Sequence, residues 1–109
     1  MKIQPSKLEA LSESWFRRNR EEMAACLAAG EPLLVHGKPY LTYENLEHHL
    51  DPNYIGQVMK AVELCGREPE RGGKHVQRIL EGAALDLINA HESAFRASYE
   101  EEINRSEAA

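Results

Sequence analysis

The sequence predicts a mainly α-helical protein of four helices, the last of them long, with one short β-hairpin inserted after the first helix. Three observations lead to this fold class. Apolar residues recur at helical spacing, Pro and Gly stand where helices should begin and end, and 109 residues suffice for one core without disulfides or metal. We therefore expect a single domain over residues 1–109, with residues 1–5 and 104–109 disordered.

The first helix should begin at a capping box formed by Ser6 and Glu9. Gly30 can supply the left-handed residue that ends it, and Pro32 prevents its continuation. Apolar positions mark one face of this helix: Leu8, Leu11, Trp15, Phe16, Met23, Cys26 and Leu27.

Residues 33–42 predict the β-hairpin. Gly37 can adopt the positive φ of a tight turn, and Pro39, which has no amide donor, suits an edge strand. Because a lone two-stranded ribbon is marginal in water, the hairpin should lie on the helices or pair with the edge of a second copy.

Two shorter helices are expected next. Thr42 should cap the second helix, and Asp51 with Pro52 should start a third helix that ends at Gly66. Residues 67–74 then predict a flexible loop. The third helix has an apolar side that we expect to point inward: Ile55, Val58, Met59, Val62 and Cys65.

The longest periodic segment, residues 75–103, predicts one helix of about 40 Å. That length exceeds what a compact domain of this size can cover, since its radius of gyration is about 13 Å. The apolar stripe also rotates, because from His91 onward it advances in steps of four, each turning it by about 40°. We therefore expect a second copy or another protein to cover four residues: Leu85, Phe95, Tyr99 and Ile103. Close helix approach should compensate for Gly56 in the third helix and Gly82 in this one.

Composition and charge exclude several classes of function. The net charge of −5 disfavours nucleic-acid binding, which requires excess Lys and Arg. The opening residues lack a signal segment and no run approaches eighteen apolar residues, so we expect a cytoplasmic protein without a membrane partner. Cys26 and Cys65 are interpreted as small buried hydrophobes. No cofactor or metal site is expected, because Glu44 and His48 are two ligands where zinc needs more.

Arg67, Arg71, Lys74 and Arg78 are the candidate residues for binding an anion or a partner. Gly72 and Gly73 among them would let backbone amides approach an anion at a helix start. A solvated connector is the alternative interpretation of the same residues.

Residues 42–64 resemble the spacing of a helix-turn-helix unit. Its second helix would offer Asn53, Gln57 and Lys60 to base edges. A single lysine beside Glu63 is a poor phosphate anchor, so DNA binding is kept as an alternative.

No nucleophile–base signature appears, so we expect no enzyme. The sequence predicts a small non-enzymatic regulator, adaptor or inhibitor that binds another macromolecule, foremost a protein, and acts as a homodimer. The alternatives are a helix-turn-helix transcriptional regulator and a metal-binding protein.

Overall fold

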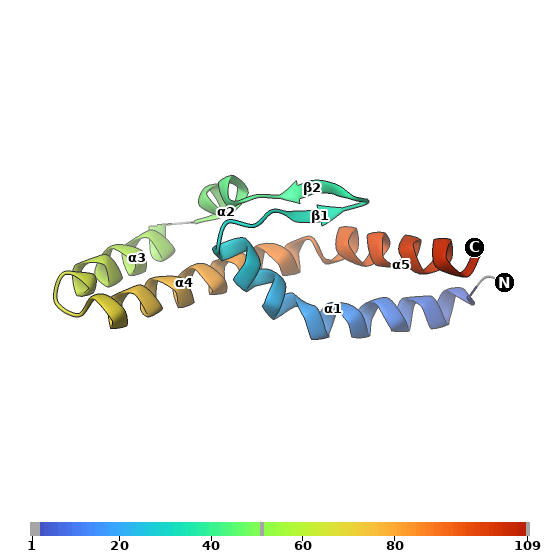
Figure 1. The fold of residues 1–109 in the computed structure, drawn as a ribbon, viewed down its shortest axis with the longest axis horizontal. Helices are drawn as coiled ribbons and strands as arrows, with labels where there is room; N and C mark the ends of the chain where they lie inside the picture. Colours follow the sequence, from blue (N-terminus) through green and yellow to red (C-terminus); the bar gives the residue numbers. More distant parts are fainter. Residues whose placement is uncertain (1–2, 51, 109) are drawn as a thin grey trace.

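Five helices and one β-hairpin form the part of the chain that the computed structural model describes, residues 3–50 and 52–108 (Figure 1). The mainly helical class and the hairpin are confirmed, but the predicted number of four helices is wrong. In chain order the elements are α1 (Pro5–Ala28), β1 (Leu33–Val35), β2 (Lys38–Leu41), α2 (Tyr43–His49), α3 (Pro52–Cys65), α4 (Pro69–Ala90) and α5 (Glu92–Ala108).

The extra helix arises because the predicted long helix is broken at His91. This residue leaves helical geometry, with φ −111° and ψ 21°, and its carbonyl accepts the amide protons of Ala94 and Phe95 at 3.1 and 3.3 Å. The break lets α4 and α5 each turn its own apolar side toward the core, which one straight helix with a rotating stripe could not do.

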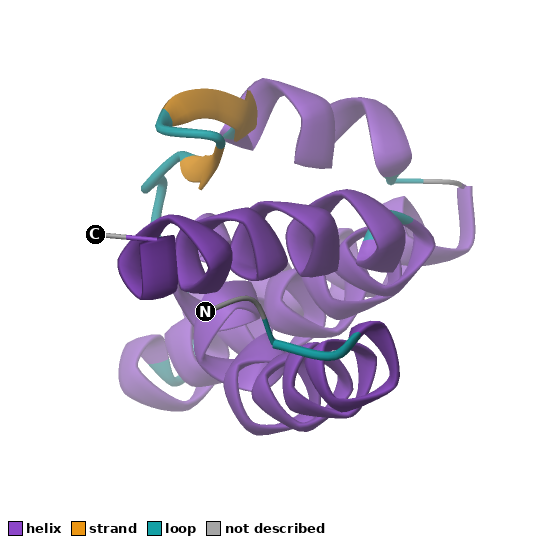
Figure 2. Ribbon diagram, turned by 90° about the vertical axis from the view of Figure 1, so that its right-hand side faces the viewer, coloured by secondary structure: helices purple, strands orange, loops and turns teal. Residues whose placement is uncertain are grey.

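α4 and α5 nevertheless run end to end as the spine of an elongated molecule (Figure 1). The principal extents are 59 × 21 × 21 Å and the radius of gyration is 17.0 Å. α1 packs along both spine helices on one side, while the β-hairpin and α2 lie on the other side (Figure 2). α3 folds back on α4, and this pair, the α3–α4 hairpin, projects at the end opposite the two termini (Figure 1). The largest fully buried apolar side chains are Phe16, Leu27, Leu46 and Ile88.

Most helix boundaries follow the predicted signals. Gly30 adopts φ +98° after α1, and Thr42 forms a capping box with Asn45 at the start of α2. Pro52 is the first residue of α3, whereas its predicted cap, Asp51, lies outside the described residues. The capping box expected at Ser6 is wrong, because α1 already begins at Pro5 and no side chain caps it.

The flexible loop expected at residues 67–74 is mostly helix. α4 begins at Pro69, and the Gly72 amide donates to the Glu68 carbonyl at 2.9 Å. At the C-terminus α5 continues through residues 104–108, where disorder was expected. Residues 1, 2 and 109 lie outside the described chain.

Close helix approach occurs at Gly72, not at the two glycines for which it was predicted. A Cβ atom on Gly72 would lie 2.6 Å from both the amide nitrogen and the Sγ atom of Cys65. A Cβ on Gly56 or Gly82 would meet nothing within 4 Å. Gly72 therefore sets the spacing between α3 and α4.

The β-hairpin lies on helices of its own chain, one of the two arrangements that its marginal stability predicts. Its turn residues His36 and Gly37 both have positive φ, +53° and +76°, as a tight hairpin turn requires. The His36 amide donates to Ser98 Oγ at 3.0 Å, and the His36 ring pairs with Glu101. These contacts attach the tip of the hairpin to α5.

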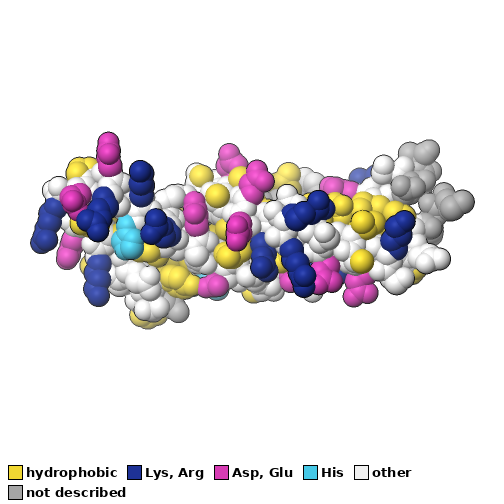
Figure 3. All heavy atoms as spheres, turned by 90° about the horizontal axis from the view of Figure 1, so that it is seen from below, with side chains coloured by type: hydrophobic (Ala, Val, Ile, Leu, Met, Phe, Trp, Pro, Cys, Tyr) yellow, Lys and Arg dark blue, Asp and Glu magenta, His cyan; other side chains and the backbone are white. Residues whose placement is uncertain are grey.

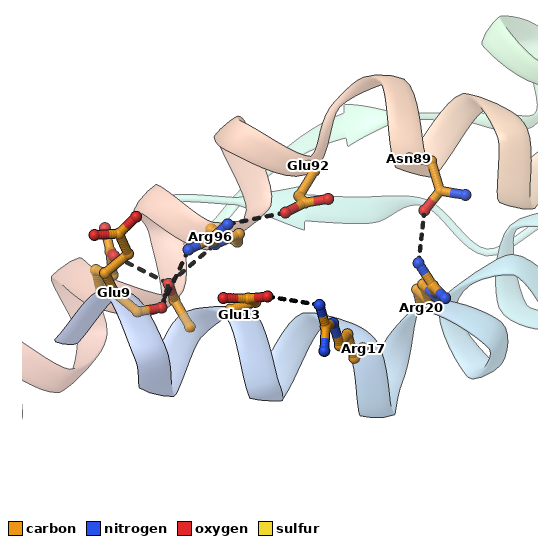
Figure 4. A network of polar contacts seen from close by, with 9 residues as sticks. Glu9, Glu13, Arg17, Arg20, Asn89, Glu92 and Arg96 are labelled. Atoms are coloured by element: carbon orange, nitrogen blue, oxygen red, sulfur yellow. Dashed lines mark hydrogen bonds and ion pairs between the residues drawn. The ribbon is translucent and has the colours of Figure 1, made fainter. Parts of the chain in front are cut away.

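A polar cluster fastens α5 to α1 (Figure 4). Arg96 donates to Ser12 Oγ and to the Glu9 carbonyl, both at 3.1 Å, and pairs with Glu92 at 2.9 Å. Ser12 is fully buried and its hydroxyl lies 3.0 Å from a carboxylate oxygen of Glu100. α5, the C-terminal half of the spine, is thus held against α1 of the same chain.

Candidate partner-binding surfaces

The residues predicted to meet a second copy are covered in large part by their own chain. Phe95 is only 2% exposed and belongs to the core, so its assignment to an interface is corrected. Tyr99 stacks on Trp15, and Leu85 packs against the core while half-buried. Ile103 is also half-buried. The physical reason is that α1 and the β-hairpin cover α5 from two sides, which the isolated periodicity of residues 75–103 could not reveal.

Three of the exposed large apolar side chains of the described chain lie on α3 instead. Ile55, Met59 and Val62 are 48%, 64% and 57% exposed, and we call them the apolar stripe. They were predicted to point inward, and that prediction is wrong. Their spacing of four and three residues places them on one side of the helix. α3 packs on α4 through a different side, where Ala61 is buried. The stripe is therefore free within the described chain.

A second surface lies on α4, where Arg71, Lys74 and Arg78 form what we call the basic face. These residues are spaced i, i+3 and i+7. Because α4 already begins at Pro69, this spacing places all three on one side of the helix. Figure 3 shows Lys and Arg side chains, with a His and with Asp or Glu side chains among them, at the end where α3 and α4 meet. Three of the four residues predicted to bind an anion or a partner thus lie together.

Arg67, the fourth predicted residue, lies in the turn between α3 and α4, where its amide donates to the Leu64 carbonyl at 3.0 Å. A groove of about 360 Å³ runs beside the basic face, lined by Leu64 of α3 and by Arg71, Lys74, His75 and Arg78 of α4. Leu64 gives this groove an apolar wall.

The apolar stripe and the groove lie on opposite flanks of the α3–α4 hairpin. At about 100° per residue, Leu64 is turned by roughly 140–180° from each residue of the stripe. Because Leu64 lines the groove, the stripe faces away from it. One hairpin therefore presents two chemically different surfaces.

The geometry gives little support to the helix-turn-helix alternative. Asn53, Gln57 and Lys60 are all exposed on α3. However, α2 packs against α1 and α4, whereas α3 packs against α4. In a DNA-reading unit the two helices pack on each other. Here both α2 and α3 pack on α4.

The described residues contain neither a metal-binding group nor a membrane-spanning helix. Across residues 3–50 and 52–108, no three His, Cys, Asp or Glu side chains are grouped so that they could hold a metal ion. Within the same residues, every helix is too short or too polar to cross a lipid bilayer. Comparison of the chain with family models, characterised proteins and solved structures gave no match. The two surfaces of the α3–α4 hairpin are therefore the candidate binding surfaces of the described chain.

Proposed function

We propose that this chain is a small non-enzymatic adaptor or regulator that binds another protein through the apolar stripe of α3. The observation that carries the proposal is the exposure of Ile55, Met59 and Val62, each about half or more open to water, in one row on a projecting helix. Exposed apolar groups in a contiguous patch mark sites of protein–protein contact.

The surroundings of the stripe support a helix-in-groove mode of binding. Among the described residues α3 makes its main contacts with α4, and the pair projects from the body of the molecule (Figure 1). Residues at i, i+4 and i+7 are the anchors that such a mode uses. Full burial of an aliphatic side chain is worth about 1.5–3 kcal/mol, so three half-exposed anchors supply a modest affinity that further contacts must raise.

Homodimerisation through the far half of the spine is not part of this proposal. It was predicted because Phe95, Tyr99 and Ile103 were expected to lack cover, and Phe95 and Tyr99 are covered within one molecule. DNA reading by α3 is also not part of this proposal, because α3 makes its main described contacts with α4 and not with α2.

The proposal can be tested by photo-crosslinking in cells of the source organism. A photoreactive phenylalanine analogue would replace Met59 in one variant and Leu34 in the other, because Leu34 is comparably exposed, at 53%, on β1. We expect a discrete adduct with another protein from position 59 only, and its loss when Ile55 and Val62 are changed to Ser. No adduct, equal adducts from both positions, or an adduct between two copies of the chain would overturn the proposal.

A further inference from the structure

We infer that the basic face of α4 binds an acidic helical segment of a partner protein. The basic face lies on the flank of the α3–α4 hairpin opposite the apolar stripe, so this inference does not depend on the proposed function. Its three cations are Arg71, Lys74 and Arg78, and the groove beside them is lined in part by Leu64.

The charge distribution is the first argument. Residues 52–80 hold five Lys and Arg against three Glu, whereas the rest of the chain holds eight Lys and Arg against fifteen Asp and Glu. Over the whole α3–α4 hairpin, residues 52–90, five Lys and Arg stand against five Asp and Glu, so the hairpin is neutral on an acidic protein. Three of its five cations lie on the basic face. Lys74 and Arg78 make no ion pair with another described residue, and Arg71, paired with Glu68 at 3.2 Å, is still 75% exposed. These cations are available to carboxylates from outside.

The shape of the surface favours a helix as the occupant. From Arg71 to Arg78 the face is about 10 Å long, two turns of α-helix. A partner helix with carboxylates at i, i+3 and i+7 presents its charges at the same spacing. Arg pairs with carboxylate through two parallel hydrogen bonds, which adds orientation to attraction. An apolar residue between the carboxylates would meet Leu64 in the groove.

A nucleic acid fits the same surface less well. Glu68 and Glu70 line the hollow next to the groove, together with Arg71 and Lys74. A continuous phosphate backbone that followed the basic face would meet these carboxylates. Three cations would release only about three counterions, too few for useful affinity at physiological salt. A peptide can place discrete charges and avoid the two Glu.

The probe for this inference is a fluorescent Ala-based peptide of about five helical turns, with Glu at the matching positions and Leu between them. The matched peptide carries Gln in place of each Glu. Binding is followed by fluorescence anisotropy at low salt with the wild-type chain, with R71Q/K74Q/R78Q, and with R17Q/R18Q/K38Q. The last variant loses the same charge from exposed positions on α1 and β2.

We expect the Glu peptide to bind the wild type and the R17Q/R18Q/K38Q control equally. It should bind the basic-face variant about tenfold more weakly, since exposed ion pairs contribute little each. Single K74Q should lower affinity about twofold, which keeps the test valid if the triple variant unfolds. Equal binding to both triple variants, no preference over the Gln peptide, or tighter binding of a single-stranded DNA oligonucleotide would overturn the inference. So would self-association of the wild type that R71Q/K74Q/R78Q abolishes, since the occupant would then be a second copy.

Discussion

The indole ring of Trp15 in α1 stacks on the phenol ring of Tyr99 in α5, with ring centroids 4.7 Å apart and planes inclined by 8°. The two residues are far apart in sequence, and their contact holds the C-terminal helix against the first one. Tyr99 was expected to be covered by a second copy or another protein. It is covered instead by Trp15 of its own chain.

Replacing Tyr99 by Ala should lower the free energy of unfolding by about 2 kcal/mol, because stacking and half of an aromatic burial are lost. Tyr99→Phe keeps the ring and should change stability by less than about 0.5 kcal/mol. Urea unfolding followed by far-UV circular dichroism measures both. An unchanged midpoint in Tyr99→Ala would show that the stacked pair does not hold α5.

The contact between Gly72 and Cys65 leads to a second prediction. A methyl group at Gly72 would meet Cys65 backbone and Sγ atoms at 2.6–2.7 Å, so α3 and α4 must separate. Gly72→Ala should therefore cost about 1–3 kcal/mol of stability despite the better helix propensity of Ala. Gly82→Ala is the matched control, because nothing lies within 4 Å of its Cβ position. It should stabilise the protein by up to about 1 kcal/mol. A lower midpoint of thermal unfolding for Gly72→Ala and a higher one for Gly82→Ala would confirm the prediction. Equal shifts of the two midpoints would contradict it.

The same glycine explains why the sequence predicted a loop where the structure has helix. Gly72 and Gly73 are unfavourable in a helix by about 1 kcal/mol each, and local propensity alone favours a connector. Tertiary packing reverses this at Gly72, because only a residue without Cβ allows the approach of Cys65. The helical start at Pro69 then places Arg71, Lys74 and Arg78 on one face. These cations could be identified from the sequence, but their arrangement on one face could not.

Other differences also come from tertiary contacts. No Pro or Gly marks the break at His91, and the only sign of it in the sequence was the rotation of the apolar positions along residues 75–103. The apolar residues of α3 follow a normal amphipathic pattern, but α4, its main described neighbour, leaves Ile55, Met59 and Val62 about half or more exposed. Helix ends marked by Gly30, Gly66 and Pro52 were predictable, because backbone conformation at those residues is decided locally.

Cys26 gives a prediction about thiol chemistry. Its thiol is hydrogen-bonded to Glu31, and this bond, burial, and the negative charges of Glu31 and Glu22 raise the pKa of the Cys26 thiol. A raised pKa lowers the thiolate fraction at a given pH, and the thiolate is the nucleophile. Glu31→Ala should lower the pKa and accelerate alkylation of Cys26 by iodoacetamide at neutral pH.

The measurement uses a Cys65→Ser background, so that one thiol remains. The alkylation rate should rise with pH and reach its plateau at lower pH in Glu31→Ala than in the parent. Glu21→Ala removes a carboxylate of α1 that does not act on Cys26, and it should leave the rate profile unchanged. Identical profiles for the parent and Glu31→Ala would refute the role of Glu31.

The buried hydroxyl of Ser12 provides the final prediction. It accepts a hydrogen bond from Arg96 Nε at 3.1 Å and lies 3.0 Å from each of two acceptors, the Glu9 carbonyl and the Glu100 carboxylate. Ser12→Ala leaves part of the Arg96 guanidinium without a partner, so stability should fall by about 1–2 kcal/mol. Ser14→Ala, on the exposed side of α1, should be neutral or slightly stabilising.

A double-mutant cycle separates the network from the packing. Arg96→Met keeps the aliphatic length of the side chain but removes its donors to Ser12, Glu9 and Glu92. Because Ser12 and Arg96 share one network, Ser12→Ala should cost less in the Arg96→Met background than alone, with a coupling of about 0.5–3 kcal/mol. Additive losses in urea unfolding would show that the two side chains act independently. The attachment of α5 to α1 would then rest on apolar contacts such as that of Trp15 with Tyr99.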